Sequence, residues 1–83
     1  KKRKGIINMF TTIKKLTAIK RLDNSINGNP NYKLYFGPEV VRTPKDSMLA
    51  YKISDAYLNK ECQVTYYYND KEQAFLKDIE KLD

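Results

Sequence analysis

Residue types on which many enzymes depend are scarce in this sequence. Its 83 residues include no histidine, one cysteine and three glycines. Without histidine the commonest general base is missing, and a structural zinc site of the usual Cys/His kind is excluded. The glycines lack the neighbours of a phosphate-binding loop or a dinucleotide-binding fingerprint. The single cysteine, Cys62, cannot form an internal disulfide, which is typical of a protein from a reducing cytoplasm.

Long apolar runs are missing as well. The longest is far shorter than the roughly 20 residues that cross a bilayer, and no secretory apolar core follows the basic start. We therefore expect a cytoplasmic protein with no membrane partner. The length predicts one domain near the lower limit for burying an adequate core, so a homodimer is a further expectation.

Positive charge dominates and is concentrated at the start of the chain. The formal net charge is +6, from 16 Lys and Arg against 10 Asp and Glu. Residues 1–21 contain no acid and eight bases, which are Lys1, Lys2, Arg3, Lys4, Lys14, Lys15, Lys20 and Arg21. Such a polycation binds phosphate groups by releasing counterions, without reading a base sequence.

The run of four bases at residues 1–4 has two explanations. It is either a genuine basic arm or part of a leader, residues 1–8, translated from an over-long gene prediction. The codons of Lys4-Gly5 allow AAAGGA, a ribosome-binding sequence, and Met9 follows as a candidate start. A start at Met9 removes four of the six net positive charges, leaves +2, and defines one domain at residues 9–83. Both explanations stay open.

The first half of the chain is predicted to form strands. Residues 10–22 have apolar side chains at every third position, which fits a helix loosely, but their Thr and Ile content favours a long strand with a bulge. The following DNSINGNPN is a strong turn signal. Residues 32–36 and 40–43 then form two further strands across the Gly37-Pro38 turn.

The second half is predicted to begin with a helix. Asp46 or Ser47 is the N-cap of a short helix over residues 48–53. The alternation of residues 61–69 predicts a fourth strand. The tail at 71–82 is ambiguous, because its composition favours a helix with one apolar face, whereas pairing back onto the fourth strand would make it a fifth. The residues of that apolar face are Phe75, Leu76, Ile79 and Leu82.

This element order predicts a mainly β (α+β) domain. Three strands, one short helix and two further strands match a small OB-like five-stranded barrel or curled sheet, with the helix between strands three and four. A second pattern comprises Gly28, Pro30, Tyr32, Arg42-Thr43, Asp46-Ser47 and Tyr51-Lys52-Ile53. This pattern resembles small uncharacterised OB-like proteins of bacteriophages and mobile elements. The resemblance implies a bacterial host cell and assigns no catalytic residue.

No group of residues is equipped for catalysis. Nothing near Cys62 in the sequence would make it a thiolate, so we expect a small buried or edge residue. The C-terminal acids alternate with lysines, which is typical of a solvated face rather than a metal site. These acids are Asp70, Glu72, Asp78, Glu80 and Asp83. We therefore predict a protein that is not an enzyme and uses no metal and no cofactor.

Aromatic residues carry the strongest functional signal, with seven tyrosines and three phenylalanines. Exposed rings on a sheet stack on unpaired bases, while nearby cations bind phosphates. The strand faces that contain Leu34 and Val64 are predicted to fill the core, so Tyr35 and Tyr67 are the predicted stacking residues. The predicted phosphate-binding residues are Lys14, Lys15, Lys20, Arg21, Lys33 and Arg42. Together they predict binding of single-stranded DNA or RNA with low sequence specificity.

Other interpretations stay open. A tyrosine buries its ring and leaves its hydroxyl in water, so seven tyrosines need no ligand. Arg42 would equally be explained by an ion pair with Asp46 or Asp55. The alternative function is a protein-binding module, such as a phage-encoded inhibitor or accessory subunit with tyrosines as interface anchors. An amphipathic C-terminal helix packed on another chain would favour that function or a homodimer.

Overall fold

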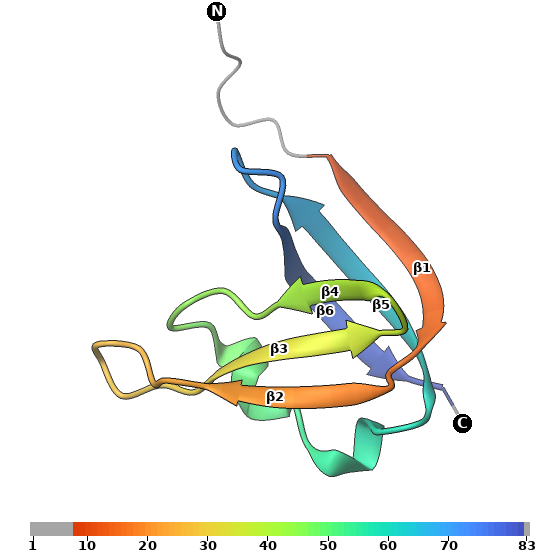
Figure 1. Cartoon of the computed structure of the whole chain (residues 1–83), viewed down its shortest axis with the longest axis horizontal. Helices are drawn as coiled ribbons and strands as arrows, with labels where there is room; N and C mark the ends of the chain where they lie inside the picture. Colours follow the sequence, from red (N-terminus) through yellow and green to blue (C-terminus); the bar gives the residue numbers. More distant parts are fainter. Residues whose placement is uncertain (1–7, 83) are drawn as a thin grey trace, which may run out of the picture.

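A computed structural model describes residues 8–82 of the chain, and Figure 1 shows a mainly β domain. The strands are β1 (Met9–Lys15), β2 (Ala18–Leu22), β3 (Asn31–Phe36), β4 (Glu39–Arg42), β5 (Glu61–Tyr68) and β6 (Ala74–Lys81). They form one open sheet of six strands in the order β1-β5-β6-β4-β3-β2. The prediction of a mainly β fold is confirmed, but within residues 8–82 the sheet has six strands instead of the predicted five and does not close into a barrel. The basic run at residues 1–4 lies outside the described residues.

The sixth strand exists because the predicted first strand is divided in two. β1 pairs with β5 and β2 pairs with β3, both antiparallel. Between them, the N–H of Leu16 donates to the carbonyl of Lys60 at 3.1 Å, and the N–H of Thr17 donates to that of Tyr35 at 2.7 Å. The side chain of Leu16 is fully buried. One continuous segment therefore changes partners at Leu16 and forms both ends of the strand order.

Alternating side chains of the strands form the core. The buried hydrophobic residues are Leu16, Leu34, Phe36, Val41, Ala50, Ile53, Cys62, Val64, Leu76 and Ile79. The prediction that Leu34 and Val64 face the core is confirmed, since both are at most 1% exposed. Each fully buried Val, Leu, Ile or Phe side chain stabilises the fold by about 1.5–3 kcal/mol.

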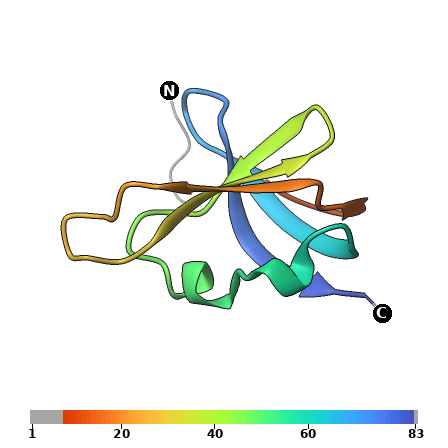
Figure 2. The same ribbon diagram turned by 60° about the horizontal axis from the view of Figure 1, so that its bottom comes forward.

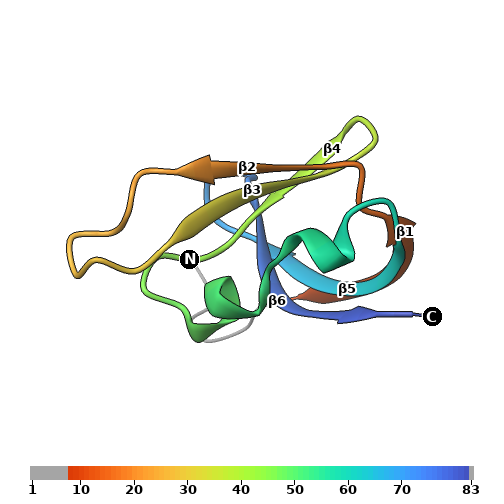
Figure 3. The same cartoon turned by 90° about the horizontal axis from the view of Figure 1, so that it is seen from below.

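The segment between β4 and β5 forms two 3-10 helices, η1 (Met48–Lys52) and η2 (Asp55–Tyr57). The predicted helix over 48–53 is thus found as shorter, tighter turns. The reason is that Ala50 and Ile53 are both buried, and a spacing of three matches the 3.0 residues per turn of a 3-10 helix. Figure 3 shows both segments crossing between β3 on one side and β5 and β6 on the other. No helix among residues 8–82 is long and apolar enough to span a membrane.

Of the two predicted N-caps, Ser47 caps η1 and Asp46 has a different role. The Ser47 hydroxyl accepts from the N–H of the second residue of η1 at 3.1 Å. The Asp46 carboxylate accepts hydrogen bonds from Ser25, from Asn27 at 3.0 Å and from Asn29 at 2.9 Å. These hydrogen bonds lower the pKa of Asp46, and the bond from Ser25 has the largest effect. Asp46 therefore ties the loop after β4 to the loop between β2 and β3.

The C-terminal tail is a strand, so the helical alternative is wrong. The pairing of β6 with β5 shifts register once, since Thr65 lies opposite Asp78 while Tyr66 lies opposite Leu76. Lys77 is therefore the extra residue of a β-bulge. The bulge turns both Leu76 and Ile79 toward the core, although a regular strand would place them on opposite faces. Their three-residue spacing explains why the sequence resembled a helix.

β4 and β6 meet in parallel at a single point, where Arg42 lies opposite Phe75. Figure 2 shows the tip of the β3–β4 hairpin pointing away from β6. Most of β4 is thus paired only with β3, whose register runs from Lys33 opposite Arg42 to Phe36 opposite Glu39. This incomplete pairing leaves room for the cavity described below.

Candidate nucleic-acid interface

Three bases form a row across β2, β3 and β4. Lys20 lies directly opposite Lys33, and Lys33 lies directly opposite Arg42. Directly opposed residues of antiparallel strands point to the same face, with Cβ atoms about 4.5–5.5 Å apart. Because Leu34 and Val41 face the core, the row lies on the opposite, outer face. We call this set, Lys20, Lys33 and Arg42, the basic row.

Tyr35 lies on the same outer face as the basic row. It is half-buried and lies opposite Ala18 of β2 and Val40 of β4, both of which are exposed. A small and a medium side chain therefore flank the ring rather than cover it. The structure thus brings four predicted residues, Tyr35 and the basic row, onto one accessible face.

The basic row has no acidic partner in the described chain. Among residues 8–82, the only bases that form ion pairs are Lys14 and Lys52. Arg42 pairs with neither Asp46 nor Asp55, so that alternative is not found, and its Nε is buried without a hydrogen-bond partner. Like charges directly opposite each other destabilise a sheet. A bound polyanion would remove this repulsion.

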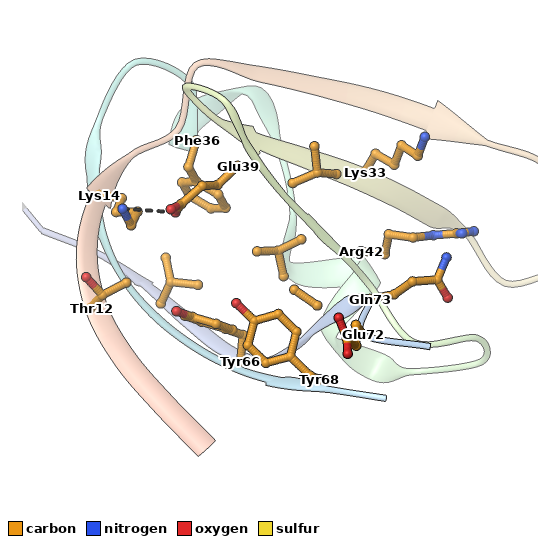
Figure 4. Close-up of a pocket in the computed structure, with 14 residues that line it drawn as sticks. Thr12, Lys14, Lys33, Phe36, Glu39, Arg42, Tyr66, Tyr68, Glu72 and Gln73 are labelled. Carbon is orange, nitrogen blue, oxygen red and sulfur yellow. Dashed lines mark ion pairs between the residues drawn. The ribbon is translucent and has the colours of Figure 1, made fainter. Parts of the chain in front are cut away.

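A cavity of about 410 Å³ opens beside the basic row, between β4 and the strands β1 and β5 (Figure 4). Its rim includes Lys33 and Arg42, and it is also lined by Lys14. Its remaining lining residues are Thr12, Phe36, Glu39, Val40, Val41, Val64, Tyr66, Tyr68, Glu72, Gln73 and Ala74. Its size falls within the usual range of ligand sites, about 300–1,000 Å³.

An ion pair spans one end of the cavity. The Nζ of Lys14 lies 2.9 Å from the Oε1 of Glu39, and both side chains are partly exposed. The hydrogen bond to Glu39 raises the pKa of Lys14. Lys14, predicted as a phosphate ligand, is therefore neutralised by a carboxylate in this structure.

Three aromatic rings form a cluster, and two of them, Tyr66 and Tyr68, line the cavity. The ring centroids of Phe10 and Tyr66 are 5.6 Å apart, those of Phe10 and Tyr68 are 5.8 Å apart, and those of Tyr66 and Tyr68 are 5.7 Å apart. Burial raises the pKa of Tyr66, whereas Tyr68 is 52% exposed. Figure 4 shows both tyrosine hydroxyls directed toward the cavity.

The sequence reasoning missed these three rings. Tyr66 and Tyr68 share a strand face with Val64 and were therefore expected to fill the core. The expectation was wrong for Tyr68, because the core ends before the end of β5. The sequence around Phe10 does not predict that it joins this cluster, because its place opposite Tyr66 depends on the pairing of β1 with β5.

The other predicted site residues lie elsewhere. Lys15 is exposed at the end of β1, opposite Glu61. Arg21 lies over the ring of Tyr32, with its Cζ 5.5 Å from the centroid. Tyr67 is half-buried and stacks on Phe75, with centroids 6.0 Å apart. These residues do not join the basic row or the cavity.

Groups with catalytic or metal-binding potential are few in the described chain. Cys62 is fully buried, as predicted, and burial raises the pKa of its thiol. Residues 8–82 hold no group of three or more Cys, Asp or Glu side chains placed to bind a metal ion. Two of the C-terminal acids, Asp78 and Glu80, pair instead with Lys52 at 3.2 and 3.0 Å.

Comparisons of the chain with family models, with curated proteins and with solved structures found no match.

Proposed function

We propose that the chain binds single-stranded nucleic acid on the outer face of β2, β3 and β4. The observation that carries the proposal is the basic row, three cations in register without acidic partners among residues 8–82. Phosphates of a strand would neutralise the row, and Tyr35 would stack on an adjacent base. Readout of phosphate charge and ring faces predicts little dependence on base sequence at this face.

An OB-like arrangement of the sheet supports the same proposal. If β1 and β2 are counted as two halves of one strand, the pairing runs from β2 through β3, β4, β6 and β5 back to β1. We propose that this is a partly open OB-like sheet. In that fold, strands two and three form the face that binds oligonucleotides, and here they would be β3 and β4. The phage or mobile-element setting and the cytoplasmic location stay predictions.

The test is a fluorescence-anisotropy titration of a labelled single-stranded oligonucleotide at several salt concentrations. The double variant Lys20→Gln/Lys33→Gln is compared with Lys60→Gln/Lys77→Gln, which removes the same charge from exposed positions outside the row. Each lost phosphate contact is expected to flatten the plot of log affinity against log salt by about 0.7, so the row variant should lose about 1.4. Both double variants contain the basic run at residues 1–4, so its contribution to the salt dependence is the same in each. Equal slopes in the two variants would overturn the proposal.

The second candidate function is a protein-binding module, and one observation favours it. A hollow of about 480 Å³ on another part of the surface is lined by apolar residues that include Met9, Met48 and Tyr67. Met48 is 79% exposed. Methionine and tyrosine are common anchors of protein interfaces. The helical C-terminus that would have strengthened this candidate is not found, because the tail is β6. A stoichiometric complex that resists salt would favour it over nucleic-acid binding.

A further inference from the structure

The cavity beside the basic row is not needed for binding on the outer face. It exists because β4 meets β6 only at Arg42, so the rest of β4 stands apart from β5 and β6. A strand on the outer face would nevertheless pass its rim, since Lys33 and Arg42 belong both to the basic row and to the cavity lining.

The cavity walls suit an aromatic group. Phe36, Val41 and Val64 are buried side chains that form an apolar floor. Tyr66 and Tyr68 add two rings that meet edge to face, with an angle of 86° between their planes. Half of the surface of Tyr68 is open to solvent, which leaves an aromatic surface free for a ligand. Stacking on such rings tolerates any base, because every base has a π-face.

The charges of the rim indicate that the ligand carries a phosphate. On one side, Lys33 and Arg42 have no carboxylate partner within residues 8–82. Lys14, in contrast, is already paired with Glu39. The bases without an ion-pair partner therefore lie on the side of the cavity that continues into the basic row. Glu72 lines the cavity on this side as well, and among residues 8–82 it forms no ion pair with Lys33 or Arg42. Polar side chains at the rim, such as Gln73, offer hydrogen bonds to a base edge.

We propose that the cavity receives one unstacked base of the bound strand, with the phosphate of that nucleotide held by Lys33 and Arg42. This inference rests on the proposed function and deepens it, because a base in a walled cavity makes more contacts than a base on an open face. The base would lie against Tyr66 and Tyr68 above the apolar floor. The same chemistry is present in a free nucleotide, so the experiment separates the two sources.

The experiment compares Tyr68→Ala with Tyr51→Ala in the full chain. Both tyrosines are exposed, at 52% and 58%, but Tyr51 lies in η1 and does not line the cavity. Each protein is titrated with a short thymidine oligonucleotide and with an abasic oligonucleotide that has the same number of phosphates. Circular dichroism during heating confirms that both variants fold.

We expect Tyr68→Ala to weaken binding of the thymidine strand by about 5- to 150-fold, the equivalent of roughly 1–3 kcal/mol per stacked base. Binding of the abasic strand should be unchanged, because the phosphate contacts remain. Tyr51→Ala should bind both strands like the wild type. Unlabelled thymidine monophosphate should compete weakly. If the protein bound the mononucleotide in a Tyr68-dependent way but bound neither oligonucleotide, the ligand would be a free nucleotide, and the assignment of the cavity to a base of a nucleic-acid strand would be overturned.

Two further outcomes separate the inference from the proposed function. Loss of affinity in Lys20→Gln/Lys33→Gln, with Tyr68→Ala unchanged on both strands, would overturn the cavity inference alone. Failure of the wild type to bind either strand at low salt would overturn both proposals. A second measurement uses the wild type only. A strand with one 5-iodouracil should photo-cross-link to Tyr66 or Tyr68, and cross-links confined to Tyr35 would contradict the inference.

Discussion

Replacing Lys33 by Gln should stabilise the folded protein while weakening its binding to nucleic acid. Lys33 lies between Lys20 and Arg42, so its charge is opposed on both sides by a like charge. Cross-strand pairs contribute about 0.2–1 kcal/mol, and partial exposure keeps the cost of each like-charged pair at about 0.2–0.5 kcal/mol. Removing the central charge relieves both pairs and should raise the free energy of unfolding by about 0.4–1 kcal/mol. Gln retains much of the aliphatic stem, which limits the loss of packing.

The gain should appear as a rise in Tm. For a domain of this size, 1 kcal/mol corresponds to roughly 4–8 °C, so the expected rise is about 2–8 °C. It should shrink as salt rises, because the repulsion is screened within about 10 Å at 0.1 M salt. The same variant should flatten the salt dependence of oligonucleotide binding by about 0.7. Calorimetry and anisotropy on one protein preparation measure both effects.

Lys60→Gln is the matched control. Lys60 is exposed in the loop before β5, so its substitution removes the same charge from a position outside the row. It should leave both Tm and the salt slope nearly unchanged. A lower Tm for Lys33→Gln would refute the argument from like charges. A slope equal to that of the control would refute the assignment of Lys33 to phosphate binding.

Three more results are expected. Glu39→Gln releases Lys14 from its ion pair, so oligonucleotide affinity at low salt should rise and its salt slope should steepen by about 0.7, whereas an unchanged slope would place Lys14 away from the strand. Leu34→Ala should lower the free energy of unfolding by about 2–5 kcal/mol in urea titrations, because Leu34 is 0% exposed; a cost below 1 kcal/mol would contradict its place in the core. Asp46→Asn should lower Tm at neutral pH. The lowered pKa of Asp46 means that its contribution is present above about pH 3.8 and is lost as pH falls through the folded value, so the two Tm curves should converge in acid.

Part of the candidate site was predictable from local pattern. Lys33 and Tyr35 had to share a face of their strand, because Leu34 between them is apolar and strand side chains alternate. The bases of the first segment were equally visible. Their grouping was not, because Lys20 joins Lys33 through strand pairing, whereas Arg21 turns to the other face and packs on Tyr32.

The C-terminal tail shows where local pattern misleads. Leu76 and Ile79 are three residues apart, which is a helical spacing, yet both are buried in β6. The bulge at Lys77 accounts for this, and a bulge is a property of the pairing between two strands. The sequence of residues 74–81 alone therefore does not predict the bulge.

The sequence by itself determined the mainly β character, the positions of the turns, the burial of Leu34 and Val64, and the excess of positive charge. These follow from properties of single residues and their near neighbours, which act whatever the rest of the chain does. Only the tertiary structure decided that one segment serves both ends of the sheet, that three bases form a row, and that a cavity opens beside them. Those features depend on register between strands that are far apart in sequence, and register is settled by packing of the whole core.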